Sequence, residues 1–468
     1  MKLVRLSDRG AALVTVIMIM LVTMTFSGIA LTYVVSQSKT EAYYENNISA
    51  VHAAEAGLNQ YLWYLNKEGA PEIAMDTDIS YPDYHAIAKF KLHKKIAECT
   101  DSKIVIEATG WMIHAPDIKR TIKATFTKRS FTQYVYFSDN DPDNIWWMSS
   151  DTCYGPYHTN TRLSISGSPK FYNTVSYVSE IKYKEGVSNN PYFKITPEKV
   201  AAINFPLDNS ALKSYAKQSG GYYFTGRTCI KLMGNQIKVR NLSGTQMLNL
   251  PTNGVIYVDD ALGAGSSKFD TKAGNVFIYG ELDGRLTVGS KRDIYITGYD
   301  PTIYELSAAK AASPTQGIMY RDTSFGITPD HNVQVNVTSG QEGDMLGLIA
   351  DTNVAILTYG WFDDDTCDSS RRNITVHAAI FAMKGSFANS YQIGGTGNYS
   401  YPNPGGTLTV RGAIIQNTRG AVGVSYNGDE TGYVKDYAHD TRMMYDSPPF
   451  FLMPEESGWE IKDWVEKE

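Results

Sequence analysis

The residues that could carry out chemistry in this sequence stand apart from one another. His158, within GPYHTN, has no histidine or cysteine close to it in sequence, so a hydrogen-bonding role is favoured over catalysis or metal binding. His377 is a weaker candidate, because an internal repeat places Arg411 at the equivalent position. We therefore expect a solvated polar side chain at position 377 and no catalytic histidine.

Acidic residues form two clusters. SDNDPDN places Asp139, Asp141 and Asp143 at alternate positions, which would suit Ca²⁺, but the EF-hand pattern fails at Asn144 and Ser150. A turn rich in Asp and Asn is therefore favoured there.

The second cluster is Asp363-Asp364-Asp365, followed by Arg371-Arg372. Carboxylates and a basic residue in one groove would suit polysaccharide cleavage, but this run has the composition of a solvated loop. Phosphate-binding loops, GxSxG and HExxH motifs are absent from the sequence. We predict no enzymatic activity, no cofactor and no metal, and keep a tethered polysaccharide-active enzyme as an alternative.

Composition limits the class of protein. Cys99, Cys153, Cys229 and Cys367 lack metal-ligand spacing, and both two disulfides and four buried thiols remain compatible with the sequence. With 43 Lys+Arg against 49 Asp+Glu, nothing suggests nucleic acid as a partner. The 39 Gly, 32 Tyr and short β-branched runs favour a strand-rich body outside the cytoplasm.

The stretch Ala11–Val35 contains no charged residue and is long enough to cross a membrane as a helix. Lys2, Arg5 and Arg9 precede it against a single Asp8, so the positive-inside rule keeps residues 1–10 in the cytoplasm and the C-terminal body outside. A cleaved secretory signal is disfavoured, because its apolar region usually spans only about 7–15 residues. Residues 11–35 are thus expected to contact membrane lipid.

The helical pattern continues through residues 36–69. Apolar residues recur every three or four positions, which predicts one continuous helix to Asn66 whose second half packs on a soluble domain. These residues are Tyr44, Ile48, Val51, Ala54, Leu58, Leu62 and Leu65. Gly69-Ala70-Pro71 ends the helix.

The N-terminal segment resembles a known family. Arg9-Gly10, the AALV start of the apolar run and the AAEAGL motif at residues 53–58 are similar to minor pilins of the PilX type, over residues 7–66. The resemblance implies cleavage between Gly10 and Ala11 by the prepilin peptidase, with other pilin-like subunits as partners. The family carries Phe or Met after the cut and Glu at the fifth mature position, where this chain has Ala11 and Thr15.

The helix is therefore expected to take part in assembly. Small residues let membrane helices approach closely. The residues assigned to this role, from the apolar run and from the motif, are Thr15, Gly28, Ala30, Ala53, Ala54, Glu55 and Gly57.

The rest of the chain reads as mostly β. Alternating runs over residues 70–131 predict a small antiparallel sheet that completes a pilin-like α+β head. In residues 132–445, the segment ITVHAAIF at 374–381 superposes on LTVRGAII at 408–415. This repeat predicts a right-handed parallel β-helix or solenoid. An antiparallel sandwich is the alternative fold. A helical or loop insertion is expected near 185–250, and residues 446–468 are described as a C-terminal tail. Most of 131–468 resembles a domain of unknown function that follows PilX-like N-termini.

Aromatic residues give the body two interpretations. They either fill cores or, where exposed, stack on sugars or contact a protein ligand. The residues in question are Trp146, Trp147, Tyr154, Tyr157, Tyr222 and Tyr223. We predict a membrane-anchored minor-pilin-like or pseudopilin-like protein whose solenoid serves in display or adhesion, with a surface glycan or protein as the ligand. An uncleaved membrane-tethered scaffold or adhesin is the alternative.

Overall fold

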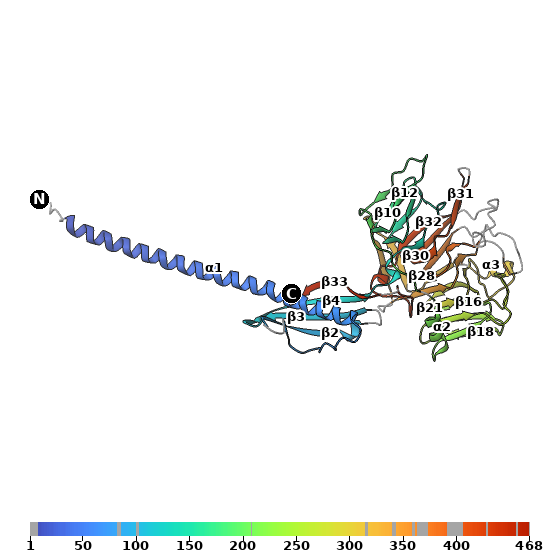
Figure 1. Cartoon of the computed structure of the whole chain (residues 1–468), viewed down its shortest axis with the longest axis horizontal. Helices are drawn as coiled ribbons and strands as arrows, with labels where there is room; N and C mark the ends of the chain where they lie inside the picture. The colour runs from blue at the N-terminus through green and yellow to red at the C-terminus, as the bar shows by residue number, and fades with distance from the viewer. Residues whose placement is uncertain are drawn as a thin grey trace. The chain divides into compact units, whose positions relative to one another are not determined.

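The computed structural model describes residues 8–81, 86–99, 103–206, 208–313, 317–338, 343–357, 361–362, 373–390, 406–426, 429–454 and 457–467. The chain divides into two compact units (Figure 1). One unit comprises Met1–Thr127 together with Trp459–Glu468, and the other comprises Lys128–Gly458. We call the first the head, with its helix, and the second the body. The fold is mostly β with one long N-terminal helix, as the sequence predicts.

Helix α1 runs from Asp8 to Asn66 without interruption. No proline lies within it, and its described side chains are exposed from Ala12 to Glu45. Gly69, at φ +72°, adopts the left-handed conformation that favours glycine just beyond the helix end. The predicted continuous helix is therefore confirmed within the described residues.

The head is a five-stranded sheet in the order β1-β2-β3-β4-β33. Its elements are β1 (Ile79–Tyr81), β2 (Ala88–Lys94), the 3₁₀ turn η1 (Ile96–Glu98), β3 (Lys103–Met112), β4 (Ala115–Lys128) and β33 (Trp459–Lys467). Strands β1 to β4 pair antiparallel. The prediction of a C-terminal tail for residues 446–468 is wrong for its last part, because β33 joins the head sheet beside β4. The body is consequently an insertion between two neighbouring strands of the head.

The second half of α1 covers one face of this sheet. Its buried residues are Ala50, Ala53, Ala54, Leu58 and Tyr61. Alternation along β2 buries Phe90 and Leu92 beneath them. The predicted stripe was partly wrong, because Tyr44 and Ile48 remain 64% and 58% exposed. They belong to the segment of α1 that precedes its contact with the sheet.

The body consists of short strands, most of them stacked in parallel ladders, with antiparallel pairs within residues 228–249, 323–337 and 423–439. The first group is β5 (Tyr136–Asn140), β6 (Trp147–Met148), β7 (Thr152–Tyr154), β8 (Tyr157–Thr159), β9 (Leu163–Ser166), β10 (Lys170–Phe171), β11 (Val175–Tyr177), β12 (Ile181–Tyr183), β13 (Tyr192–Phe193) and β14 (Glu198–Lys199). The second is β15 (Tyr222–Thr225), β16 (Thr228–Gly234), β17 (Gln236–Asn241), β18 (Gly244–Asn249), β19 (Val255–Asp259), β20 (Val276–Leu282), β21 (Arg285–Ser290) and β22 (Ile294–Ile296). The third is β23 (Gly317–Tyr320), β24 (Thr323–Ile327), β25 (Val333–Val337), β26 (Met345–Ala350), β27 (Val354–Ile356), β28 (Ile374–Ala382), β29 (Phe387–Asn389), β30 (Gly406–Thr418), β31 (Gly423–Tyr426) and β32 (Asp429–His439).

The internal repeat corresponds to two stacked strands. β28 pairs parallel with β30 from Ile374 opposite Leu408 to Ala382 opposite Gln416, which is the register the sequence superposition predicts. Parallel ladders of this kind are compatible with a solenoid-like body and disagree with an antiparallel sandwich. The hand of the coil stays a prediction.

The order of the strands in the stack differs from their order in the chain. One ladder runs β15-β19-β21-β26-β28-β30 and then continues into β5-β8-β11-β14. The first strands of the body therefore lie beyond its last long strand. Arg129 N donates to Gly458 O at 3.1 Å, so the two ends of the body are adjacent.

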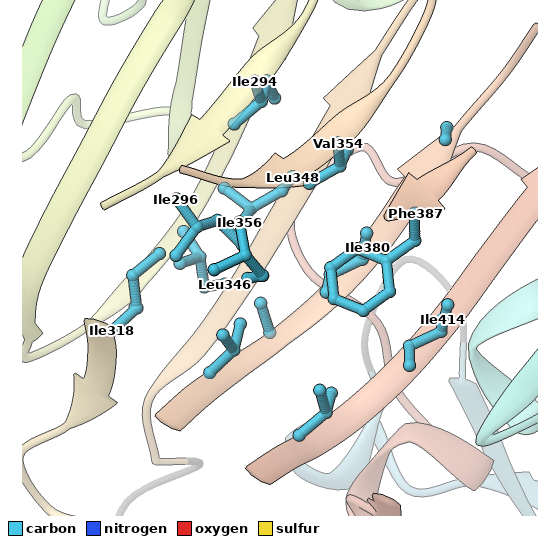
Figure 2. Packing of buried hydrophobic residues seen from close by; sticks show 14 of the residues in the cluster. Ile294, Ile296, Ile318, Leu346, Leu348, Val354, Ile356, Ile380, Phe387 and Ile414 are labelled. Atoms are coloured by element: carbon cyan, nitrogen blue, oxygen red, sulfur yellow. The ribbon is translucent and has the colours of Figure 1, made fainter. Parts of the chain in front are cut away.

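One hydrophobic core runs along the inside of the coils. Figure 2 shows Ile294, Ile296, Leu346, Leu348, Ile380 and Ile414 among its members, contributed by successive strands. A second cluster draws residues from β19, β26, β28, β30 and β5, and helix α2 (Ser210–Lys217), which contacts β15 and β19, contributes Leu212 and Ala216 to it. The insertion expected near 185–250 thus contains one short helix, followed by β15 to β18. The other helical elements of the body are η2 (Phe131–Gln133), α3 (Leu306–Ala311) and η3 (Thr441–Met444).

Candidate membrane and assembly helix

The first half of α1 exposes a long apolar surface. Leu13, Met24 and Phe26 are 64%, 76% and 68% exposed, and no part of the most apolar window of the helix is buried. An apolar surface of this length is not stable in water and requires lipid or other apolar helices around it. By length and composition the helix is able to cross a membrane.

The hydroxyl groups in this half are accommodated by the helix itself. Thr23 Oγ1 donates to Met20 O at 3.0 Å, Thr25 Oγ1 to Val22 O at 2.8 Å, and Thr32 Oγ1 to Gly28 O at 2.8 Å. An unsatisfied hydroxyl would be costly in hydrocarbon, whereas a hydroxyl bonded to the preceding turn is not. The helix backbone therefore satisfies the hydroxyls of these three threonines.

The small residues assigned to assembly divide into two groups. A Cβ added to Gly28 would have no atom within 4 Å, and Thr15 and Ala30 are exposed. These positions are available to another helix. Gly10 and Ala11 lie in α1, but their side chains are outside the described part of the chain.

Residues of the AAEAGL motif pack instead against the head's own sheet. Ala53 and Ala54 are buried, and a Cβ on Gly57 would lie 2.6 Å from Phe90 Cδ2. Gly110 of β3 approaches the helix so closely that a Cβ would collide with the backbone at Ala50 and Ala54. The motif therefore contributes to the contact between helix and sheet within one chain. Glu55 points outward, 3.1 Å from His52 Nδ1.

The histidines of the body have structural surroundings. His158 is buried, with Nδ1 2.8 Å from Ser176 Oγ and Nε2 2.9 Å from Asn160 Oδ1. Burial lowers its pKa. This is the hydrogen-bonding role that the sequence favours.

His377 differs from the expectation. Its Nδ1 accepts a hydrogen bond from Tyr320 N at 3.1 Å, and the rings of Tyr320 and Phe325 pack against it. Burial, together with Arg411 and Arg442, lowers its pKa to about 3. A solvated position was the wrong interpretation, because the β24–β25 hairpin supplies Phe325 from outside the repeat.

The carboxylates of SDNDPDN have separate partners. Asp141 is fully buried and pairs with Arg419 at 3.3 Å, whereas Asp143 is exposed and pairs with Arg162 and Lys182. Burial raises the pKa of Asp141, and the facing guanidinium opposes this shift. Asp139 accepts from Asn160 Nδ2 at 2.6 Å. Each carboxylate therefore has its own cationic or amide partners.

Most of the aromatic candidates also serve packing. Trp147 and Tyr157 are buried inside the coils, and their rings contact each other. Tyr154 stacks on Tyr172 with ring centroids 5.0 Å apart. Tyr222 and Tyr223 donate hydrogen bonds to Asn249 O and Asp259 Oδ2. Trp146 is half-buried, with Lys182 and Lys184 near its ring.

Cys99, Cys153 and Cys229 are free thiols, and burial raises the pKa of Cys153 and of Cys229. Cys367, the three aspartates 363–365 and the arginines 371–372 lie outside the described residues. Within the described part, no three His, Cys, Asp or Glu residues are grouped as metal ligands.

Comparison with known proteins adds little to this geometry. No protein-family model matches the sequence, and no curated protein matches it. Among solved structures, the chain is similar to the competence-associated pilin ComZ from Thermus thermophilus, with 11% identity over 90% of this chain and 97% of that one. The TM-score is 0.23, so this similarity carries no argument about the present protein.

Proposed function

We propose that the protein is a membrane-anchored, pilin-like subunit that assembles through α1 and carries the body as a display or adhesion module. The observation that carries this proposal is a single helix with two different halves. The side chains that its first half exposes between Ala12 and Val35 are uncharged and mostly apolar, and three of its threonine hydroxyls are bonded within the helix. Its second half is the packing partner of a small sheet. Such a subunit can be stored in a bilayer and later exchange lipid for neighbouring helices.

The finer assignment rests on the resemblance to PilX-type minor pilins at residues 7–66. It includes cleavage after Gly10 by the prepilin peptidase, a cytoplasmic leader, and other pilin-like subunits as partners. Gly28 supports the assembly step, because its surface leaves room for close approach of a second helix. The uncleaved scaffold or adhesin differs only in retaining the leader.

The body supports display rather than catalysis in this proposal. His158, His377 and the carboxylates of SDNDPDN are engaged in internal hydrogen bonds and ion pairs. Because the ends of the body are adjacent, it can be carried by the head as one inserted module. A surface glycan or a protein is the class of ligand that we propose for it.

Alkaline extraction of cell membranes tests the anchor. We expect the full chain to stay with the membrane fraction and a variant with Ile17→Lys and Val22→Lys to be released. Each lysine at the helix centre costs about 3 kcal/mol of insertion. The matched control is Ile17→Leu with Val22→Ile, which keeps the segment apolar. Release of the unchanged chain would refute the proposal.

A further inference from the structure

The end of the head sheet nearest the apolar half of α1 carries exposed apolar side chains. Tyr81, Ile87 and Ile113 are 46%, 60% and 43% exposed. Backbone hydrogen bonds from Ile113 N to Ile87 O and from Ile87 N to Tyr81 O hold them together. We call these three residues the apolar tip.

A hydrogen bond places the tip beside α1. His114 Nε2, in the turn between β3 and β4, lies 2.8 Å from Asn46 Oδ1. Asn46 is eleven residues beyond Val35, the end of the apolar run, which corresponds to about 16 Å along the helix. The tip is thus close to any bilayer that the first half of α1 crosses.

Lysines flank the tip. Lys89, Trp111 and Lys119 lie in one register row across β2, β3 and β4. Lys119 Nζ lies 4.9 Å from the centroid of the Trp111 ring. Asp117, in β4 two residues before Lys119, removes part of the positive charge. Apolar side chains flanked by lysines are the composition of a surface that rests on anionic lipid.

The length of the apolar run favours contact with the bilayer. Twenty-five residues span about 37 Å, against about 30 Å of hydrocarbon, and a helix that is too long tilts. A tilt of about 35° matches the two lengths and lies within the observed range. With this tilt, Asn46 lies about 13 Å above the hydrocarbon core. A group that lies about 10 Å from the helix axis, on the side toward which the helix leans, is then about 7 Å above the hydrocarbon core. That level is within the headgroup layer.

We propose that the apolar tip and its lysines dock on the anionic headgroup surface of the membrane that α1 spans, and hold the head there while the subunit is stored. This inference rests on the proposed membrane anchor. Docking would be lost when the helix leaves the bilayer, so the tip would then be exposed to solvent or to a neighbouring subunit. The partner is an anionic phospholipid surface.

The test uses the full chain in vesicles of phosphatidylcholine, with and without phosphatidylglycerol, that carry a headgroup-attached nitroxide quencher. An environment-sensitive fluorescent amino acid replaces Ile113 or, as a matched control, Ile96. Ile96 is 79% exposed and follows β2 at the opposite end of the sheet. We expect quenching at position 113 to exceed that at position 96 several-fold. Lys89→Glu with Lys119→Glu, or high salt, should reduce it.

The outcomes separate this inference from the anchor. Equal quenching at positions 113 and 96, in a chain that still resists alkaline extraction, would overturn the docking and leave the anchor intact. If the fluorescence at position 113 changes with the number of protein copies per vesicle and not with the phosphatidylglycerol content, the tip contacts a second copy of the chain. That result would also overturn the proposal. Release at alkaline pH would overturn both.

Discussion

At the scale of single residues, buried polar groups of the body contribute to its stability through their ion pairs and hydrogen bonds. Asp141 and Arg419 are completely buried and join the start of the body to the end of β30. Asp141→Ala leaves the guanidinium without its carboxylate, and we expect a loss of about 3–5 kcal/mol in the free energy of unfolding by urea. Asp143→Ala, at an exposed ion pair, is the control and should change little. Similar losses for both would contradict the role of the buried pair.

His377 makes stability depend on pH. Its folded pKa of about 3 lies below its ordinary value of 6.5, so the unfolded chain binds the proton more readily. The contribution of the neutral histidine to the free energy of unfolding is therefore fully present above about pH 6.5. This contribution falls as the pH is lowered towards 3. Between about pH 7.5 and pH 5 we expect it to account for about 2 kcal/mol.

The comparison is between the native chain and His377→Asn, whose amide oxygen can accept from Tyr320 N without titrating. Urea unfolding at the two pH values should show a smaller acid loss in the variant. Identical losses would show that His377 is not buried as a neutral side chain. The sequence could not indicate this, because Phe325 comes from a hairpin outside the repeat.

At the scale of elements, the contact between α1 and β3 depends on glycine. A Cβ on Gly110 would meet helix backbone, which cannot move aside as a side chain can. We expect Gly110→Ala to lower the stability of the head by about 1–3 kcal/mol in thermal or urea unfolding. Gly28→Ala is the control, since no atom lies within 4 Å of its added Cβ. A tolerated Gly110→Ala would mean that helix and sheet are farther apart than described.

Local pattern predicted the elements well where one rule applied. Apolar composition without proline predicts α1, alternation predicts β2 to β4, and the repeat at an offset of 34 predicts the register of β28 on β30. The predicted burial of Tyr44 and Ile48 is wrong, because the spacing of apolar residues does not show where the sheet begins to cover the helix. The AAEAGL motif was assigned to assembly, and its fit to Phe90 needs the three-dimensional contact.

At the scale of the whole molecule, the order of the units was not readable from the chain. No local signal in Tyr136–Asn140 indicates that it follows β30 in the stack, and none in Trp459–Lys467 indicates that it returns to the head sheet. Both are long-range pairings. The result is a head interrupted by a body whose ends meet, an arrangement that suits one module carried by another.

The central claim, a subunit anchored by α1 and released into an assembly, is tested most directly by N-terminal sequencing of the mature protein from its native membrane or filament. The account predicts a sequence that begins at Ala11, after removal of residues 1–10 by the prepilin peptidase. A sequence that begins at Met1 or Lys2 would contradict it and support the uncleaved tether.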